Sequence, residues 1–501
     1  MKKIYAAAAA LLMTATSSFA GGILTNTNQS VAFLRNPARD AAIGLDGVYS
    51  NPAGVAFMPE GLHLAFNWQY AHQTRTITST NPVFALGRKN DGNLTKTFEG
   101  VADAPIIPSL QAAYNKGNWS IQFNFSIPGG GGACEFSDGL GSFERVVGGI
   151  AKMLEPLGAQ GYDMDGYMEG RQYYYGFQLG TAYKIYPNLS VYGGLRMLIG
   201  DATYKAKISN IMVKYNNAYV DFADYLQGAA TTVNNALDLV NAGIEQYEAA
   251  GVPAPAELAA QKAQLDGTRN SLTQLQKYAD GVNLLSNQTS VGIAPVIGID
   301  WKYKNFNFAA KYEFKTQIRM KNESTVNKAS AIPAVNKFRD NEKVNEDQPA
   351  LLTLGAQWSP IDAVRINAGW HHFFDKDADW YNNTQEQLKS NTNEFLLGGE
   401  WDVTDKLTVS AGGQLTRYGL TDEYMNDMSF VVNSYSIGFG FSYKIKDYIT
   451  LSAAYFQTNY GHYDVNYQDH KEMEGMLTIP AGKDSYTRTN RVLGIGCQVD
   501  I

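Results

Sequence analysis

Runs in which every second residue is bulky and apolar recur along this chain. In the clearest run, 434–443, Tyr, Ile and Phe alternate with Ser and Gly, and similar runs occupy 351–358 and 493–501. Because successive side chains of a strand point to opposite faces, each run predicts a strand with one apolar face. The other face carries small or polar residues. This pattern is typical of a barrel wall between lipid and a lumen, although a soluble β-sandwich also alternates.

The number and spacing of the runs favour the barrel. We predict fourteen strands, at 62–76, 107–116, 118–127, 171–185, 189–206, 290–303, 305–320, 349–359, 363–374, 392–403, 406–419, 431–445, 448–460 and 488–500. Tight turns and longer loops alternate strictly between them, which is the arrangement of an outer-membrane barrel. The predicted fold class is therefore all-β: a 14-stranded antiparallel transmembrane β-barrel with a small N-terminal plug and helical extracellular insertions.

Two segments precede the first strand. Lys2 and Lys3 followed by the apolar run 4–13 indicate a secretory signal peptide, cleaved after Ala20. The next segment, 21–58, has no sustained alternation and only short stretches of helical periodicity, so it needs an enclosure to stay folded. We therefore predict a signal peptide at 1–20, a plug at 21–58 and a barrel at 59–501.

The longest insertion, 207–289, shows apolar residues at helical spacing on both sides of a break at 251–253. We expect a helical hairpin packed above the barrel mouth. Its role as a docking site for a partner stays open, because such a stripe is usually the face that packs.

Composition agrees with a barrel and excludes some partners. Charged residues make up 18% of the chain, and it contains 31 Tyr, 23 Phe, 7 Trp and 48 Gly, which suits aromatic girdles and small lumen-facing residues. The net charge of −7 becomes about −9 without the signal lysines, so nucleic-acid binding is not expected. The two cysteines, Cys134 and Cys497, predict no disulfide framework, and a single bridge between them stays open.

Short motifs in the predicted plug carry a resemblance to a known family. They are Gly22-Ile23-Leu24, Ser30, Arg35, Asp46 and Asn51-Pro52-Ala53. In this order, followed by fourteen predicted strands, they resemble the FadL-type outer-membrane transporters of long-chain fatty acids and other hydrophobic compounds. The resemblance spans the mature chain. It implies passive uptake with capture at external loops, transfer past the plug and lateral release through the barrel wall.

Asn51, Pro52, Ala53 and Gly54 form the first candidate site. Asn51 and Gly54 flank a proline, which favours a tight turn. The resemblance implies that these four residues gate transport; alternatively, the turn only positions the next strand.

Arg35 and Arg39 are candidates for substrate binding. A guanidinium suits a carboxylate head group in a sheltered site, because it donates two parallel hydrogen bonds. The alternative is that these arginines bond to acids of the barrel wall and hold the plug in place.

The third predicted strand runs into Pro128, Gly129, Gly130, Gly131 and Gly132. Such a run weakens a regular ladder, so we regard it as a candidate lateral opening. Pro295 in the sixth strand is a competing candidate, and the third strand ending at a loop is a further interpretation.

Other chemistry is weakly indicated. Asp375 to Glu386 has the ligand spacing of a calcium loop, but Trp380 replaces the glycine that such a loop needs, so we expect a solvated acidic loop without metal. No nucleophile elbow or metalloprotease motif is present, and we expect neither an enzyme nor a cofactor.

We therefore expect a monomeric transporter of fatty acids or aromatic compounds, embedded in the lipid of a Gram-negative outer membrane. A general diffusion porin and a surface receptor or adhesin using the helical insertion are the alternatives.

Overall fold

The computed structural model describes residues 23–326 and 337–501, so the predicted signal peptide lies outside the described part. Fourteen long strands form the wall of the protein. They are β1 (Gly61–Thr80), β2 (Thr95–Lys116), β3 (Trp119–Phe136), β4 (Ala159–Tyr186), β5 (Leu189–Tyr215), β7 (Val282–Tyr303), β8 (Phe306–Glu313), β11 (Leu351–Ile361), β12 (Val364–Phe373), β13 (Ser390–Asp402), β14 (Leu407–Gly419), β15 (Ser434–Lys446), β16 (Ile449–Tyr460) and β20 (Gly482–Asp500).

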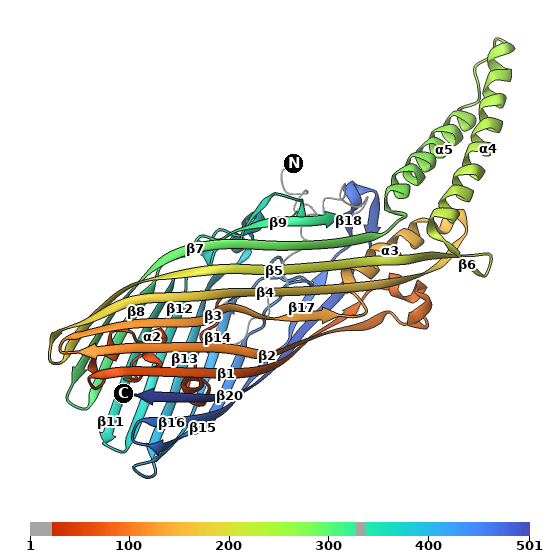
Figure 1. The fold of residues 1–501 in the computed structure, drawn as a ribbon. Coiled ribbons are helices and arrows are strands. Elements are labelled where there is room, and N and C mark those ends of the chain that lie inside the picture. Colours follow the sequence, from red (N-terminus) through yellow and green to blue (C-terminus); the bar gives the residue numbers. More distant parts are fainter. Residues whose placement is uncertain (1–22, 327–336) are drawn as a thin grey trace.

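These strands form a closed antiparallel barrel, because β20 pairs with β1 from His63–Asp500 to Thr80–Lys483. Six tight turns and the C-terminus lie at one end of the barrel, and the longer connections lie at the other (Figure 1). Both the strand number and the alternation of loop lengths are confirmed. The architecture is that of an outer-membrane protein.

The predicted alternation sets the two faces of the wall. On β15, Ile437 and Phe439 are 52% and 54% exposed, whereas Ser436 between the neighbouring outward residues is 3% exposed. The lumen face of β1 carries polar residues such as Asn67, Gln69 and Gln73. Apolar side chains therefore point to lipid, and small or polar side chains point inward.

The strands at the long-loop end extend further than predicted. The loop expected at 77–106 is largely strand, because β1 reaches Thr80 and β2 begins at Thr95. The helical insertion expected at 207–289 is also shorter. Its flanks belong to β5 and β7, and only α4 (Phe222–Ala249) and α5 (Ala256–Leu275) with their connection form the hairpin.

The position of the hairpin also differs from expectation. Its base packs through Phe222, Leu226 and Leu275 on a buried cluster with Val213 of β5. The remainder projects away from the barrel instead of covering the mouth (Figure 1). The hairpin tip therefore gains little from tertiary packing.

Shorter elements complete the fold. The helical ones are α1 (Val31–Arg35), α2 (Gly47–Ser50), η2 (Gly54–Phe57), η3 (Pro82–Leu86), η4 (Arg88–Asn90), α3 (Gly141–Met153), η5 (Glu155–Leu157), η6 (Gln276–Tyr278), η9 (Asp375–Asp377), η10 (Tyr381–Gln387) and η11 (Met473–Gly475). The short strands are β6 (Ala218–Asp221), β9 (Arg319–Val326), β10 (Lys343–Asn345), β17 (Tyr463–Tyr467), β18 (His470–Glu472) and β19 (Leu477–Ile479). No described helix is long and apolar enough to cross a membrane. Cys134 and Cys497 are both free.

Residues 23–58, which we call the plug, lie inside the barrel. The plug starts its first helix where Ser30 Oγ accepts a hydrogen bond from Phe33 N at 3.1 Å, an N-cap that satisfies one free helix donor. Val31 and Leu34 of α1 are at most 1% exposed and share an apolar cluster with Phe456 and Val492 of the wall. The barrel thus supplies the enclosure that the plug sequence lacks.

Candidate functional site

The turn at Asn51–Gly54 is tied to the wall by its side chain and its backbone. Asn51 Nδ2 donates to Asp300 Oδ2 on β7 at 2.6 Å. Gln122 of β3 donates to the Pro52 carbonyl at 2.7 Å, and Ser190 of β5 donates to the Ala53 carbonyl at 2.6 Å. Three strands therefore hold one turn, and its proposed gating role stays a prediction.

The turn has no room for a side chain at Gly54. A Cβ at Gly54 would lie 2.3 Å from Asn51 Nδ2 and 2.8 Å from Asp300 Oδ2, inside van der Waals contact. Gly54 N also donates to Asn51 Oδ1 at 3.2 Å. The close approach of Asn51 and Asp300 to this backbone therefore depends on glycine. The sequence analysis did not select Asp300, although the alternation of β7 places it on the lumen face.

Arg35 and Arg39 bind acidic residues. Arg35 Nη2 lies 3.0 Å from Glu400 on β13, and Arg39 Nη1 lies 3.1 Å from the same carboxylate. Arg39 also makes a bidentate pair with Asp46 of the plug, at 2.8 and 2.9 Å. Burial lowers the pKa of Arg39, but Asp46 and Glu400 outweigh burial and raise its pKa above the ordinary value. This geometry favours the interpretation that the two arginines hold the plug, while their binding of substrate stays a prediction.

Glu400 has a third cationic neighbour in Arg365 of β12, at 3.3 Å. We call Arg35, Arg39, Arg365 and Glu400 the Glu400 cluster. Its side chains on the plug and Glu400 are at most 10% exposed, so water screens these charges little. Because charges buried in this way are stabilised only by their partners, the cluster fixes α1 against the wall.

His371 of β12 provides a second electrostatic tie between plug and wall. Its Nε2 lies 2.9 Å from Asp40 of the plug, and its Nδ1 lies 2.9 Å from Glu394 of β13. An imidazole donates from both nitrogens only in its protonated form. The arrangement therefore suits an imidazolium between two carboxylates. The two partners of His371 come from distant segments of the sequence, so no local pattern reveals this arrangement.

The ladder between β2 and β3 is interrupted at the predicted place. Pairing stops after Leu110–Phe125 and resumes at Asp103–Ala133, which leaves 104–109 of β2 and 126–132 of β3 unpaired with each other. We call these two segments the wall break. Gly130 has a φ of 68°, and a Cβ there would lie 2.1 Å from the Gln172 carbonyl. The Pro128–Gly132 run therefore does distort the wall, and its use as a lateral opening stays a prediction.

Plug residues occupy the inner side of the wall break. Gln29 exchanges two hydrogen bonds with the backbone of Ile127 on β3, at 3.0 and 3.2 Å, and its carbonyl accepts one from Ser109 of β2 at 2.7 Å. Asn26 donates to the carbonyls of Pro128 and Gly130, at 2.9 and 2.6 Å. The plug thus supplies hydrogen bonds that the two strands do not make with each other.

Apolar side chains continue through the wall break. Ile107 and Ile127 belong to the same buried cluster as Val31 of α1, and Tyr173 and Tyr175 of β4 pack against this cluster. The two tyrosine rings stack on each other, with centroids 5.7 Å apart and planes 5° apart. They lie on the β4 face that points away from the lumen. Tyr174 between them and Gln172 before them are buried inside the barrel. An apolar path therefore joins the plug to the outer surface.

A second interruption lies at Pro295, the competing candidate. Pairing of β7 with β8 ends at Val296–Glu313, and pairing with β9 begins at Thr289–Lys321. The segment between β8 and β9 instead pairs with 346–348, through the Thr316–Gln348 bridge. The edge near Pro295 is therefore covered by a loop, whereas the wall break is covered by the plug.

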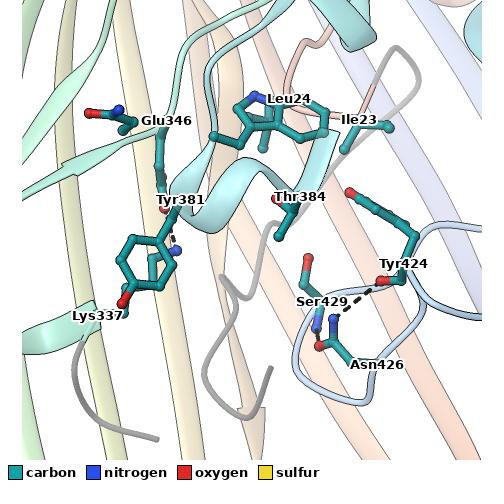
Figure 2. Close-up of a pocket in the computed structure, with 11 residues that line it drawn as sticks. Ile23, Leu24, Lys337, Glu346, Tyr381, Thr384, Tyr424, Asn426 and Ser429 are labelled. Atoms are coloured by element: carbon teal, nitrogen blue, oxygen red, sulfur yellow. Dashed lines mark hydrogen bonds and ion pairs between the residues drawn. The ribbon is translucent and has the colours of Figure 1, made fainter. Parts of the chain in front are cut away.

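The loops at the outer end leave little space near the start of the plug. A cavity of about 30 Å³ is lined by the plug residues Ile23 and Leu24, by Tyr381 and Thr384 of η10, and by the loop after β14. Figure 2 shows these lining residues. Ser429 N donates to Asn426 Oδ1 at 2.9 Å within that loop. A cavity of this size holds about one water molecule. This cavity is too small to hold a fatty acid or an aromatic hydrocarbon.

The acidic loop does not gather its carboxylates. Asp375 is buried and accepts a hydrogen bond from Thr392 N at 3.0 Å, whereas Asp379 pairs with Arg319 at 3.1 Å. Within 23–326 and 337–501, no group of three or more His, Cys, Asp or Glu side chains is placed to hold a metal ion. Asp375 is thus part of the packed loop, not of the solvated loop expected from sequence.

Comparison with known proteins finds solved structures with a similar architecture. No family model and no curated protein sequence matches the chain. Among solved structures, a Pseudomonas aeruginosa FadL homologue is similar with a TM-score of 0.61 and 12% identity, covering 96% of this chain and 100% of that chain. The P. putida toluene transporter TodX is similar with a TM-score of 0.54 and 12% identity, covering 91% and 94%.

These similarities, together with the closed wall and the internal plug, define the class as a plugged 14-stranded outer-membrane barrel. More particularly, the chain has the FadL-type transporter fold.

Proposed function

We propose that this protein takes up hydrophobic compounds passively across the outer membrane, with long-chain fatty acids as the first candidate substrates. The observation that carries the proposal is the wall break, closed from inside by Gln29 and Asn26 of the plug. A substrate leaving there enters the bilayer directly. Lateral release spares an apolar chain the cost of full solvation, which a water-filled pore would impose.

The plug is the element that would control this path. Gln29 contacts both edges of the wall break, so displacement of 26–29 would uncover it. The Glu400 cluster, His371 and the Asn51–Gly54 turn hold the rest of the plug. We infer that transport requires a local movement of 26–29 while these ties keep the plug in the barrel. The buried plug also disfavours a general diffusion porin.

The substrate class has two candidates. The resemblance found in the sequence favours fatty acids, whereas one of the similar structures is a toluene transporter. Both classes are apolar enough to prefer the bilayer to water. Binding of radiolabelled oleate and of toluene to the detergent-purified protein separates them.

Gln29→Ala tests the role of the plug. It removes two hydrogen bonds to β3, each contributing about 1 kcal/mol, so opening at the wall break should become roughly 30-fold more frequent. Hydrogen exchange at 126–132 measures this opening, and uptake of the bound substrate by cells producing the protein measures its consequence. Asn124→Ala is the matched control, because among the described residues the Asn124 side chain donates to Ser126 of its own strand, at 2.9 Å, and not to the plug.

Two results would contradict the proposal. Wild-type protein that binds neither substrate and conducts steadily in planar bilayers would indicate a porin. Faster exchange at 126–132 in Gln29→Ala with unchanged uptake would show that the wall break is not the exit.

A further inference from the structure

Tyr173 and Tyr175 of β4 point away from the lumen, yet both side chains are half-buried. Outward aromatic residues elsewhere on the wall are more exposed: Phe395 is 51% exposed and Tyr435 is 54% exposed. An aromatic girdle accounts for tyrosines on the outer face of a barrel, but not for their burial. The two rings therefore lie against a part of the wall beneath them.

The part beneath them is the wall break. Ile127 lies in the outward series of β3, in which Ile121 is 55% exposed, but Ile127 itself is only 2% exposed. Both tyrosines pack against the buried cluster that contains Ile127. On the other side of the break, Ile106 of β2 is 65% exposed. The rings thus cover the wall break from the β4 side, and Ile106 forms its uncovered edge.

A cation holds the Tyr173 ring. Arg171 lies over this ring, 6.0 Å from its centroid, and Arg171 is itself paired with Asp201 of β5 at 2.7 Å. Within 23–326 and 337–501, no cation lies over the Tyr175 ring, and its direct register neighbour on β5 is the apolar Ile199. A cation–π contact stabilises a ring in one orientation. Tyr175 is therefore the ring that moves more easily.

The strand that carries the rings is continuous. β4 pairs with β5 through both tyrosines. In contrast, β3 shifts its register against β4 between Ser126 and Gly129 and again between Gly130 and Gly132. The ring pair therefore stands on a regular strand beside a distorted one. Rotation of a side chain is enough to uncover the break, because it requires no loss of pairing in β4.

The rings also mark the outer edge of the apolar surface of β4. Toward the tight turns the next outward residues are Phe177 and Leu179, and toward the long loops they are Arg171 and Glu169. A substrate that passes beneath the rings enters the hydrocarbon layer just below this charged surface. It therefore avoids the cost of crossing water.

We propose that the stacked rings of Tyr173 and Tyr175 form an outer gate over the wall break, and that this gate selects substrates by their width. The inference rests on the proposed uptake function and adds Tyr175 to it as a specificity-determining residue. Movement of the Tyr175 ring alone opens a narrow gap beside Tyr173, which Arg171 keeps in place. An unbranched acyl chain or a single ring fits such a gap, whereas a branched molecule requires both rings to move.

The test compares uptake of a slender and a branched compound of one class. The pair is oleate and phytanate, or toluene and 1,3,5-triisopropylbenzene, according to which of oleate and toluene the wild-type protein binds. Wild-type protein should take up the slender compound about 10-fold faster than the branched one, the usual discrimination by an apolar site. Tyr175→Ala should reduce this ratio to about 3-fold or less by raising uptake of the branched compound. Tyr175→Phe keeps the ring and should match the wild type.

The matched control is Phe177→Ala. Phe177 is the next outward residue of β4, and its ring lies 5.1 Å from that of Phe125, its direct register partner in the regular part of the ladder. This variant should keep the wild-type ratio. Heat-modifiable mobility on gels checks that each barrel is folded. If Tyr175→Ala forms no barrel, Tyr175→Trp decides, because its larger ring should lower uptake of the slender compound about 3-fold.

Two outcomes would overturn the inference: a wild-type uptake ratio in Tyr175→Ala, or an equal change of the ratio in Phe177→Ala, which would show a general effect of the aromatic girdle. For Tyr175→Trp, unchanged uptake of the slender compound has the same meaning. Wild-type protein that binds neither oleate nor toluene would instead overturn the proposed function itself.

Discussion

The ion pairs between plug and wall should determine how easily the plug moves. Glu400→Gln tests those of the Glu400 cluster. Glu400 neutralises Arg35, Arg39 and Arg365 at 3.0 to 3.3 Å. Removing one partner of a buried ion pair costs about 3–5 kcal/mol. Arg39 keeps Asp46, so the loss falls mainly on Arg35, whose other side-chain hydrogen bond within 23–326 and 337–501 goes to Ser410 Oγ at 2.8 Å.

We therefore take the lower end of this range. A cost of about 3 kcal/mol corresponds to a roughly 100-fold shift toward a displaced plug. In planar bilayers, the fraction of time that Glu400→Gln spends in conducting openings should rise by about this factor. Added salt should change the opening frequency of the variant and of the wild type to nearly the same extent, because the cluster is buried and weakly screened.

Glu169→Gln is the matched control for this experiment. Glu169 of β4 pairs with Lys205 of β5 on the outer surface, where Lys205 is 46% exposed. An exposed pair contributes about 0.5 kcal/mol, so openings should change less than about 3-fold. If Glu400→Gln opens no more often than Glu169→Gln, and both barrels are intact, the Glu400 cluster does not hold the plug.

Three further changes have specific outcomes. Gly54→Ala should force Asn51 from its turn and at least double conductance openings, because the new Cβ would lie 2.3 Å from Asn51 Nδ2; unchanged conductance would contradict this. Burial raises the pKa of Asp375 to about 6 from 3.8, so this carboxyl stabilises the folded protein below about pH 4, and the contribution, about 3 kcal/mol, is lost as the pH rises through 6. Asp375→Asn should flatten this loss in melting curves between pH 4 and 7, and an identical pH profile in both proteins would refute it. Replacing 241–261 of the hairpin by a short turn should leave melting temperature and oleate binding within error, because this part projects from the barrel beyond the buried cluster at the hairpin base; lost binding would favour the receptor alternative.

The limits of sequence prediction are clearest at the long-loop end. On β1 beyond Thr74 the outward residues are threonines, while Arg75 and Ile77 point inward. The apolar-polar alternation that marks a membrane strand is therefore absent, although the ladder continues. Above the membrane, water contacts the outer face, and nothing selects apolar residues there. The strands were consequently predicted too short.

The chain by itself determined the barrel and the location of its weak point. Period-2 alternation, tight turns and a proline followed by four glycines are local properties, and they act through strand geometry alone. The partners of each charge were decided only by the closed barrel. Arg35 donates a hydrogen bond to Ser410, which lies 375 positions further along the sequence. Arg75 lies opposite Arg488 because β20 pairs with β1 and closes the barrel. Such pairs depend on register and closure, which no local pattern contains, so only the tertiary structure shows which charged side chains lie next to each other.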